Sequence, residues 1–228
     1  MKTIVVLTGA GISAESGIKT FRDSDGLWEE HRVEDVATFG AWKKNQALVL
    51  DFYNQRRRQL ADVQPNAAHI ALARLEPQYI VEIITQNVDN LHERAGSSRI
   101  LHLHGELSKA RSTCDEHLIY DIGYRDIKQG DKCEKGSQLR PHIVWFGEPV
   151  PNIITATELV QHADILLVIG TSLVVYPAAG LVNFAPADVP KYYIDPNATN
   201  SGYFRNLTVI KEKAGVAVPA LVEELLMK

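Results

Sequence analysis

The chain has 228 residues, of which 45% are hydrophobic and 23% charged, so it can bury the core of one large domain without crosslinks. Two cysteines cannot form the disulfide framework of a small secreted protein, and a formal net charge of -4 argues against binding bulk nucleic acid or an acidic membrane. No run of about 20 apolar residues and no signal peptide is visible, so we expect a cytoplasmic protein without a membrane span.

The first predicted element is a buried parallel strand at residues 3–8, which ends at the glycine-rich turn Gly9-Ala10-Gly11. A helix is expected to begin within residues 13–17. Small residues at such a turn let backbone amides approach an anion, and the helix N-terminus adds a favourable dipole. The pattern predicts a pyrophosphate site. Because the third glycine of the usual dinucleotide fingerprint falls late, at Gly17, a redox dehydrogenase is disfavoured.

Helical stretches and strands then alternate along the chain, which predicts a parallel α/β sheet. The helical pattern covers residues 34–63 and 66–75, and a closing amphipathic helix is expected over 216–228, with Pro219 in its first turn. Short β-branched or apolar runs predict the further strands, at residues 80–85, 100–103, 165–169, 192–194 and 207–210.

Polar side chains follow two of these strands where each strand ends. Thr85-Gln86-Asn87-Val88-Asp89-Asn90-Leu91-His92 comes after the strand at 80–85, and His104-Gly105 follows the strand at 100–103. Because α/β sheets bind ligands at the carboxyl ends of their strands, the two segments are expected to converge on one crevice.

Residues 108–139 differ from the rest, since they are polar, rich in glycine and carry both cysteines, Cys114 and Cys133. We interpret them as a small inserted module. The whole chain, 1–228, is then a single domain. Its large part comprises residues 1–30, 78–107 and 140–228, and a helical insert covers about 31–77.

Several segments together resemble the sirtuins, the NAD-dependent protein lysine deacylases, over residues 3 to about 214. They occur in the family's order: Gly9-Ala10-Gly11-Ile12-Ser13, 17–22, 85–92, His104-Gly105, 141–148 and Gly170-Thr171-Ser172. The resemblance implies a Rossmann-like doubly wound parallel sheet with a small inserted module. It also implies an enzyme that consumes NAD and an acylated lysine, releasing nicotinamide and O-acyl-ADP-ribose.

The resemblance implies catalytic roles for three of the strand-end residues. Departure of nicotinamide develops positive charge on the ribose, which Asn87 and Asp89 would face, and His104 would act as the general base for a ribose hydroxyl. His102 is not required by the family and is interpreted as a strand-end histidine. The NAD contacts implied by the resemblance are Gly9, Ala10, Gly11, Ser13, Glu15, Phe21, Arg22, Trp28, Gln86, Asn87, Val88, Asp89, Gly170, Thr171, Ser172, Tyr193, Ile194, Asp195 and Ala214.

Two further segments resemble the family's substrate sites. Val144, Phe146 and Gly147 match the segment that receives the acylated peptide as an added strand through backbone hydrogen bonds. Tyr53 and Arg56 lie three apart on one helical face and match the pair that recognises succinyl or malonyl lysine. Deacetylase and desuccinylase or demalonylase activity are both expected. The neighbouring Arg57 and Arg58 are interpreted as a solvated basic face.

The chain departs from the family pattern in the inserted module, at the position of a zinc ribbon. Sirtuins commonly hold zinc there with four cysteines, but only Cys114 and Cys133 are present, while Ser112 and Gly136 stand at the first and last ligand positions. His117 could be a third ligand. We predict a zinc-free module held by packing and hydrogen bonds, with no metal site. A second departure places Tyr193 where many members have asparagine.

Two alternatives to a deacylase remain. Related domains that hydrolyse NAD share the Asn87, Asp89 and His104 constellation, and a non-catalytic module could bind NAD or ADP-ribose through the glycine turn alone. The peptide-receiving segment argues against the first, and His104 argues against the second. The expected partners are acylated lysine side chains of proteins, with nicotinamide as product inhibitor. The chain is expected to be a monomer.

Overall fold

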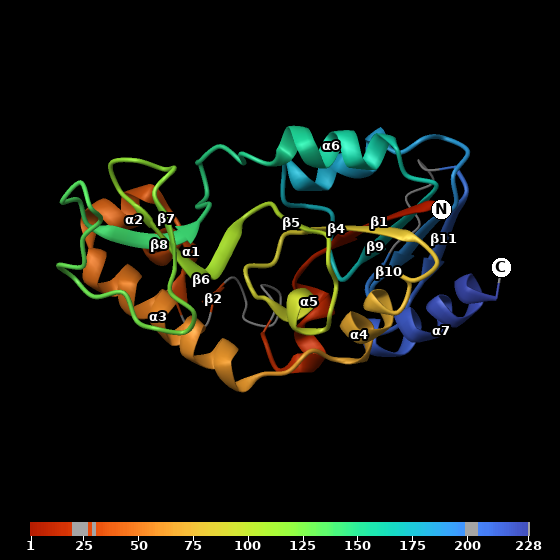
Figure 1. Ribbon diagram of the computed structural model, residues 1–228, viewed down its shortest axis with the longest axis horizontal. Helices are drawn as coiled ribbons and strands as arrows, with labels where there is room; N and C mark the ends of the chain where they lie inside the picture. Colours follow the sequence, from red (N-terminus) through yellow and green to blue (C-terminus); the bar gives the residue numbers. More distant parts are fainter. Residues whose placement is uncertain (20–26, 29–30, 199–204, 228) are drawn as a thin grey trace.

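The computed structural model describes residues 1–19, 27–28, 31–198 and 205–227. Its centre is a parallel six-stranded sheet in the order β11-β10-β9-β1-β4-β5 (Figure 1). The strands are β1 (Thr3–Thr8), β4 (Ile80–Thr85), β5 (Ile100–His102), β9 (Ile165–Ile169), β10 (Lys191–Ile194) and β11 (Leu207–Ile210). Numbered along the chain, this is the order of doubly wound dinucleotide-binding sheets. The predicted Rossmann-like fold is confirmed.

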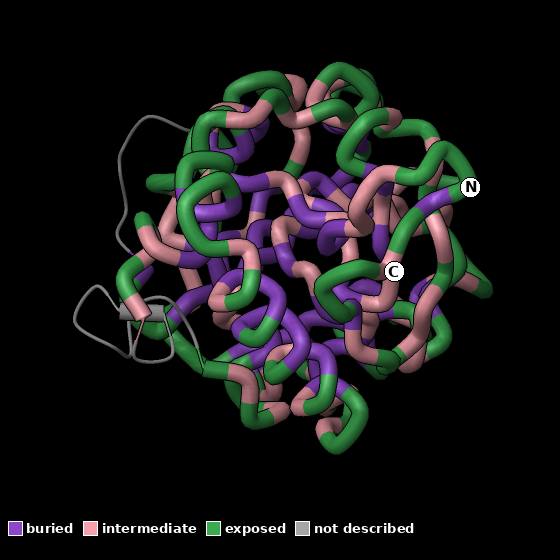
Figure 2. Tube along the Cα trace, turned by 90° about the vertical axis from the view of Figure 1, so that its left-hand side faces the viewer, coloured by how far each residue is buried: buried purple, intermediate pink, exposed green. Residues whose placement is uncertain are grey.

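The central strands are apolar throughout because helices cover both faces of the sheet. Ile4 and Val6 of β1 enter the core beneath α4 (Ala67–Ala73) and α7 (Ala214–Leu226). Val5 and Leu7 point the other way, into the core beneath α6 (Ile153–Gln161) and the 3-10 helix η3 (Ala178–Phe184). All four side chains are fully buried. Figure 2 shows buried segments at the centre of the molecule and exposed segments around them.

A second body of structure, the small lobe, lies beside the large sheet (Figure 1). It is built from α1 (Val33–Val36), α2 (Phe39–Lys44), α3 (Gln46–Asp62) and the antiparallel sheet β7-β6-β8, formed by β6 (Gly105–Ser112), β7 (Ile119–Asp121) and β8 (Leu139–Ile143). Trp42, Leu107 and Trp145 belong to its common core. The predicted helical insert at 31–77 therefore divides, since α1–α3 join the small lobe and α4 covers the large sheet.

Local capping explains why the helical stretch predicted at residues 34–63 is broken. The Thr38 side chain accepts a hydrogen bond from the Ala41 N–H at 3.0 Å, and the Asn45 side chain accepts one from Leu48 at 3.1 Å, so each begins a new helix. Two short elements complete the chain: β2 (Leu27–Trp28) pairs with β3 (His31–Arg32), and α5 (Leu91–Arg94) follows β4.

Two other helix predictions need correction. The helix expected at 13–17 is instead a pair of 3-10 turns, η1 (Ala10–Ile12) and η2 (Ala14–Ser16), which end at Gly17 with φ +92°. The closing helix α7 begins at Ala214, so Pro219 lies beyond its first turn. Of the helices in the described ranges, none combines the length and the apolar character needed to cross a membrane.

Candidate active site at the strand ends

The candidate site begins at the carboxyl ends of β1 and β9, which are neighbours at the centre of the sheet. At this position the strand order reverses, and doubly wound folds bind their ligands outside the carboxyl ends of such strands. The glycine turn after β1 meets Gly170 after β9: the Gly11 N–H donates to the Gly170 carbonyl at 2.8 Å. Gly170 in turn donates to the carbonyl of Ile194, whose side chain is fully buried in the core.

Glycine is required here by close packing. A Cβ on Gly11 would lie 2.7 Å from the Gly170 Cα, and a Cβ on Gly170, whose φ is +61°, would lie 2.2 Å from the Ile12 nitrogen. The N–H groups of Gly9, Gly11, Ile12 and Ser13 all donate to protein carbonyls. The glycines thus bring two strand ends into contact, and the pyrophosphate contact expected at this turn stays a prediction.

A buried polar network joins this turn to the segment after β4. The Asn87 side-chain amide donates to Ser13 Oγ at 3.1 Å and to the Gly9 carbonyl at 3.2 Å, while Ser13 Oγ donates to Asp89 Oδ2 at 2.9 Å. Ser13 is fully buried, and Asn87 and Asp89 are 8% and 6% exposed. Burial raises the pKa of Asp89, although hydrogen bonds from Leu91 and Ser13 oppose it. The predicted neighbours Ser13, Asn87 and Asp89 are thus brought together.

His104 lies at the start of the next strand-end segment with one ring nitrogen held by the backbone. Its Nδ1 is 2.9 Å from the Gln86 carbonyl oxygen, which can only accept, so Nδ1 carries the proton and Nε2 keeps its lone pair. Burial lowers the pKa of His104, and the hydrogen bond to Gln86 offsets this only in part. Burial therefore favours the neutral imidazole, the state that a general base requires.

His102 is more than a strand-end histidine. Its Nδ1 lies 3.2 Å from the Asn87 carbonyl oxygen and its Nε2 lies 2.7 Å from Glu93 Oε1. Burial opposes protonation, but the hydrogen bond and charge of Glu93 outweigh it and raise the pKa of His102. The contact with His102 thus holds the backbone carbonyl of Asn87 in place.

The other predicted NAD contacts divide into three groups. Gln86 donates to Thr171 Oγ1 at 3.2 Å, and the Tyr193 hydroxyl donates to the Thr171 carbonyl at 3.0 Å, so these three residues meet at the strand ends. Glu15 instead accepts from the Gly215 N–H at 2.7 Å, which ties η2 to α7 beside Ala214, and Asp195 accepts from the Asn197 N–H at 2.8 Å in a local turn. Phe21, Arg22 and the Trp28 side chain lie outside the described residues. No side-chain hydrogen bond ties Ala10, Val88 or Ser172 to the site among the described parts of the chain.

The predicted acyl-binding pair lies in the small lobe on α3. Tyr53 is fully buried, its hydroxyl accepts from Trp145 Nε1 at 3.0 Å, and burial raises the pKa of Tyr53. The Arg56 guanidinium lies 5.5 Å from the centre of the Phe52 ring. Phe52, Tyr53 and Trp145 belong to the same hydrophobic core. Tyr53 and Arg56 therefore lie beside a group of aromatic rings, the aromatic wall.

The segment predicted to receive the peptide is held by hydrogen bonds to both neighbouring regions. The Val144 N–H donates to the His104 carbonyl at 2.9 Å, and the Phe146 N–H donates to the Ala37 carbonyl at 3.0 Å. Phe146 is 49% exposed and Gly147 has φ +86°. The segment is therefore joined directly to the residue expected to act as base.

Arg57 was wrongly interpreted as a solvated side chain. It is fully buried, and its Nε and Nη1 donate to the Leu107 carbonyl and to Asn54 Oδ1, both at 2.6 Å. Burial lowers the pKa of Arg57 to about 10. Arg58 has the predicted solvated position, with a side chain 53% exposed and paired to Asp126. The sequence gives no local signal that separates the two, because Leu107 lies fifty positions along the chain.

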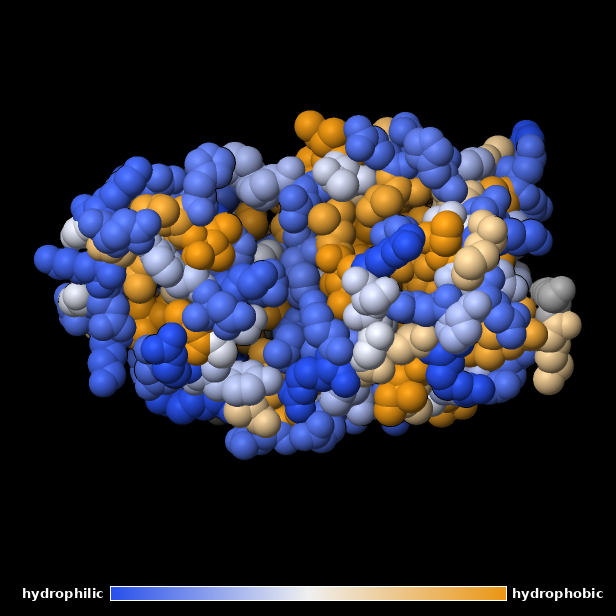
Figure 3. Space-filling model, in the orientation of Figure 1, coloured by the Kyte–Doolittle hydropathy of each residue, from blue (hydrophilic) through white to orange (hydrophobic). Residues whose placement is uncertain are grey.

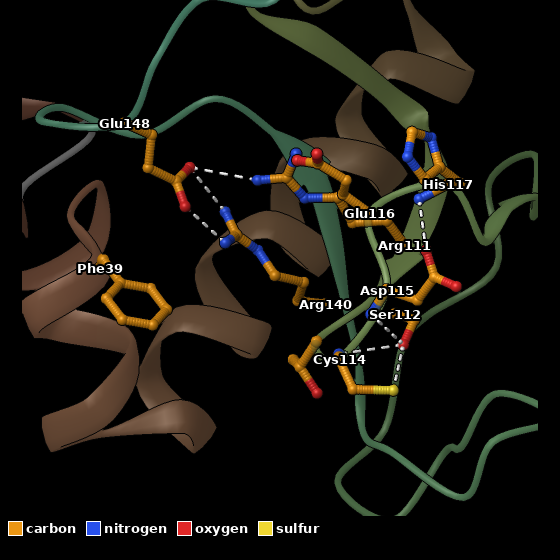
Figure 4. A pocket seen from close by; sticks show the side chains of 10 residues that line it. Phe39, Arg111, Ser112, Cys114, Asp115, Glu116, His117, Arg140 and Glu148 are labelled. Atoms are coloured by element: carbon orange, nitrogen blue, oxygen red, sulfur yellow. Dashed lines mark hydrogen bonds and ion pairs between the residues drawn. The ribbon is translucent and has the colours of Figure 1, made fainter.

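The inserted module forms an open pocket of about 500 Å³ on the small lobe (Figure 4). Ser112, predicted to replace a zinc ligand, places its hydroxyl 3.3 Å from Cys114 Sγ and 3.2 Å from Cys133 Sγ. Across the pocket, Glu148 accepts from Arg111 and Arg140. Within the described ranges, no hydrogen bond or ion pair links the thiol pair or this ion-pair cluster to Ser13, Asn87 or Asp89.

Hydrophilic residues run down the middle of the face seen in Figure 3, with hydrophobic residues reaching the surface on both sides of them. Sequence analysis passed over one apolar surface near the site, the loop after Ser172. Val174 and Tyr176 are 70% and 74% exposed there. The run Leu173-Val174-Val175-Tyr176 directly after a polar strand end could have indicated it, because exposed apolar groups beside a site favour a contact surface.

Comparisons with known proteins agree with this geometry. The model of the Sir2 family matches residues 9–177. An NAD-dependent protein deacylase of Helicobacter pylori is 58% identical over 226 residues, covering 99% of this chain and 98% of that protein. A solved Sir2 homologue in complex with NAD has a TM-score of 0.89 at 40% identity and covers 99% of this chain and 90% of its own. Sir2Af2 bound to a myristoylated histone peptide has a TM-score of 0.74 at 35% identity, with 99% and 92% covered.

Proposed function

Because this chain belongs to the Sir2 family, we propose that it is an NAD-dependent protein lysine deacylase whose general base is His104. The observation that carries the proposal is the position of His104 at the strand ends, where its Nδ1 lies 2.9 Å from the Gln86 carbonyl oxygen next to the network of Ser13, Asn87 and Asp89. The same strand ends carry the close-packed Gly9, Gly11 and Gly170, and we propose that the turn they form borders the NAD pyrophosphate.

When bound, NAD supplies a ribose carbon that an acyl oxygen can attack as nicotinamide departs. The surrounding residues would supply the stabilisation of charge and the proton transfer. Ser13 orients Asn87 and Asp89, so their polar groups would be preorganised beside the sugar on which positive charge develops. His104 would accept the proton of a ribose hydroxyl at Nε2, and the Gln86 carbonyl would stabilise the resulting imidazolium through Nδ1. This route leads to O-acyl-ADP-ribose.

The acyl group is proposed to enter the small lobe against the aromatic wall of Tyr53 and Phe52. Arg56 on the same helix supports recognition of an acidic acyl group, succinyl or malonyl, because a guanidinium beside apolar rings gains from an anionic partner. The acylated peptide would add as a strand along Val144 to Gly147, with the exposed apolar loop of Val174 and Tyr176 as a further contact. Acetyl-lysine would fit the same apolar wall without using Arg56.

The test is steady-state deacylation of matched acetyl-lysine and succinyl-lysine peptides with and without NAD. Wild type is expected to remove both groups only with NAD, Arg56→Met to lose mainly desuccinylation, and His104→Tyr to lose both activities. Arg58→Met is the matched control, because Arg58 is exposed and paired to Asp126. Equal selectivity in Arg56→Met and Arg58→Met would remove the acidic-acyl proposal.

Three further outcomes separate the alternatives. Equal NAD cleavage with and without peptide would establish an NAD hydrolase, and NAD binding without nicotinamide release would establish a non-catalytic module. Added nicotinamide is expected to inhibit deacylation as a product. We also propose a monomer in the reducing cytoplasm, the compartment expected for a chain with two cysteines and no disulfide framework; light scattering and cell fractionation test this.

A further inference from the structure

Three side chains behind the strand-end network form a mixed cluster of carboxylates and imidazole. Glu93 comes from α5, His102 ends β5 and Glu106 lies at the start of β6. One ligand atom from each, a carboxylate oxygen or the imidazole nitrogen, lies within 4.8 Å of the others. A single metal ion with bonds of about 2.0–2.2 Å to nitrogen and oxygen could bridge such atoms after small rotations of the two glutamates.

The orientation of His102 is the one that metal-bound histidines adopt. Its Nδ1 is held by the Asn87 carbonyl at 3.2 Å, which directs Nε2 toward Glu93 at 2.7 Å. A ligating histidine almost always donates its other ring N–H to a carbonyl or carboxylate, and that partner fixes the tautomer and the ring. The side chain of His102 is 9% exposed, so the ring is fixed before any ion arrives.

The two glutamates provide charge and access. The Glu93 side chain is 39% exposed, which opens the cluster to solvent, and the Glu106 side chain is 19% exposed. Lys109 donates to Glu106 Oε1 at 2.7 Å and leaves the second oxygen of that carboxylate for another partner. Two carboxylates around one imidazole offer a negative, mixed nitrogen and oxygen donor set.

We propose that Glu93, His102 and Glu106 bind a divalent transition-metal ion of the Zn²⁺ type, with a fourth position open to water. The imidazole favours this class over Mg²⁺ and Ca²⁺, which prefer all-oxygen sites. When the ion binds, the proton shared by His102 Nε2 and Glu93 leaves to solvent, and no electron is transferred. The site differs from the module position of Ser112, where thiols would be the ligands.

The ion would join α5, the end of β5 and the start of β6, where Glu93 and His102 already share one side-chain hydrogen bond. Because His102 keeps its hydrogen bond to the Asn87 carbonyl, the bound ion would stiffen the segment that carries Asn87 and Asp89. Binding to the folded state alone stabilises it by mass action. Added Zn²⁺ is therefore expected to raise the midpoint of thermal unfolding.

The experiment measures Zn²⁺ binding to the full chain by competition with a chromophoric chelator. Wild type is expected to bind one ion, and Glu93→Gln and Glu106→Gln, which are nearly isosteric, to bind it at least ~10-fold more weakly, as loss of even an outer-shell partner does. The double variant Cys114→Ser with Cys133→Ser is the matched control and should bind as wild type does.

Co²⁺ provides a second measurement on the unmutated chain. The proposal expects visible ligand-field bands without thiolate-to-metal charge-transfer absorption, and release of a proton on binding. The proposal is overturned if wild type binds neither Zn²⁺ nor Co²⁺, if the glutamate variants retain wild-type affinity, or if charge-transfer absorption and loss of binding in the cysteine variant place the ion in the inserted module.

Discussion

Replacing Gly170 with alanine should disrupt the contact between the ends of β1 and β9. The added Cβ would lie 2.2 Å from the Ile12 nitrogen and 2.6 Å from the Gly11 carbonyl carbon, whereas ordinary contacts begin at 3.4 Å. Both neighbours are backbone atoms in turns held by hydrogen bonds, so no side-chain rotation can relieve the overlap. The turn after β1 and the turn after β9 must separate by about 1 Å.

The magnitude follows from two effects. Alanine at φ +61° costs about 1–2 kcal/mol, and overpacking against backbone adds about 1–3 kcal/mol, which gives a loss of roughly 2–5 kcal/mol in the free energy of unfolding. A displacement of about 1 Å in the turn that holds Ser13 and Asn87 should lower kcat/KM about 100-fold.

Gly180→Ala is the matched control. Its nearest neighbours would be ring atoms of Tyr176 at 3.7 and 3.9 Å, so its unfolding free energy should change by less than about 1 kcal/mol. Urea unfolding and NAD-dependent deacylation of both variants check the prediction. Equal stability and equal kcat/KM in Gly170→Ala and Gly180→Ala would refute the packing argument.

Three further predictions concern single side chains. Because burial lowers the pKa of His104, the acid limb of kcat/KM should lie below pH 6.5, and a limb above that pH in a profile from 5 to 8 would contradict its role as a buried base. Asn54→Ala removes hydrogen bonds to both the N–H and the carbonyl of Ile127 and to Arg57, so urea unfolding should show a loss of about 3–5 kcal/mol, and a loss below about 1 kcal/mol would contradict it. Burial lowers the pKa of His142 to about 4, so between pH 6.5 and 4 the unfolded chain binds one more proton than the folded chain. The free energy of unfolding therefore falls as pH falls, by up to about 3 kcal/mol. In His142→Gln this loss of stability at acid pH should be smaller, and an unchanged pH dependence of the free energy of unfolding would count against the prediction.

The features that the sequence predicts correctly depend on local signals. Buried strands such as β1 and β9 are continuous apolar runs, and polar residues directly after them mark the carboxyl ends at which ligands bind. The break of the helical stretch at Thr38 and Asn45 also had a local signal, since both are favoured capping residues, but the helical periodicity on either side concealed it.

The features that the sequence misses depend on partners far along the chain. Arg57 looks like its exposed neighbour until Leu107 supplies the carbonyl that it binds. The antiparallel sheet of the small lobe pairs β6 with β8 across a polar stretch that has no strand periodicity of its own. The role of the glycine turn also depends on a distant segment, because only contact with Gly170 shows that close packing requires glycine there.

The central position of β1 has a consequence for biosynthesis. Among the strands of the large sheet this one is made first, yet one of its two neighbours, β9, begins only at Ile165. At about 5–20 residues per second, the nascent chain carries β1 for roughly 8–30 s before that partner exists. During this time the apolar edge of β1 is open, so newly made chains should depend on chaperones until β9 emerges. The crevice between the two strands is accordingly among the last parts of the molecule to form.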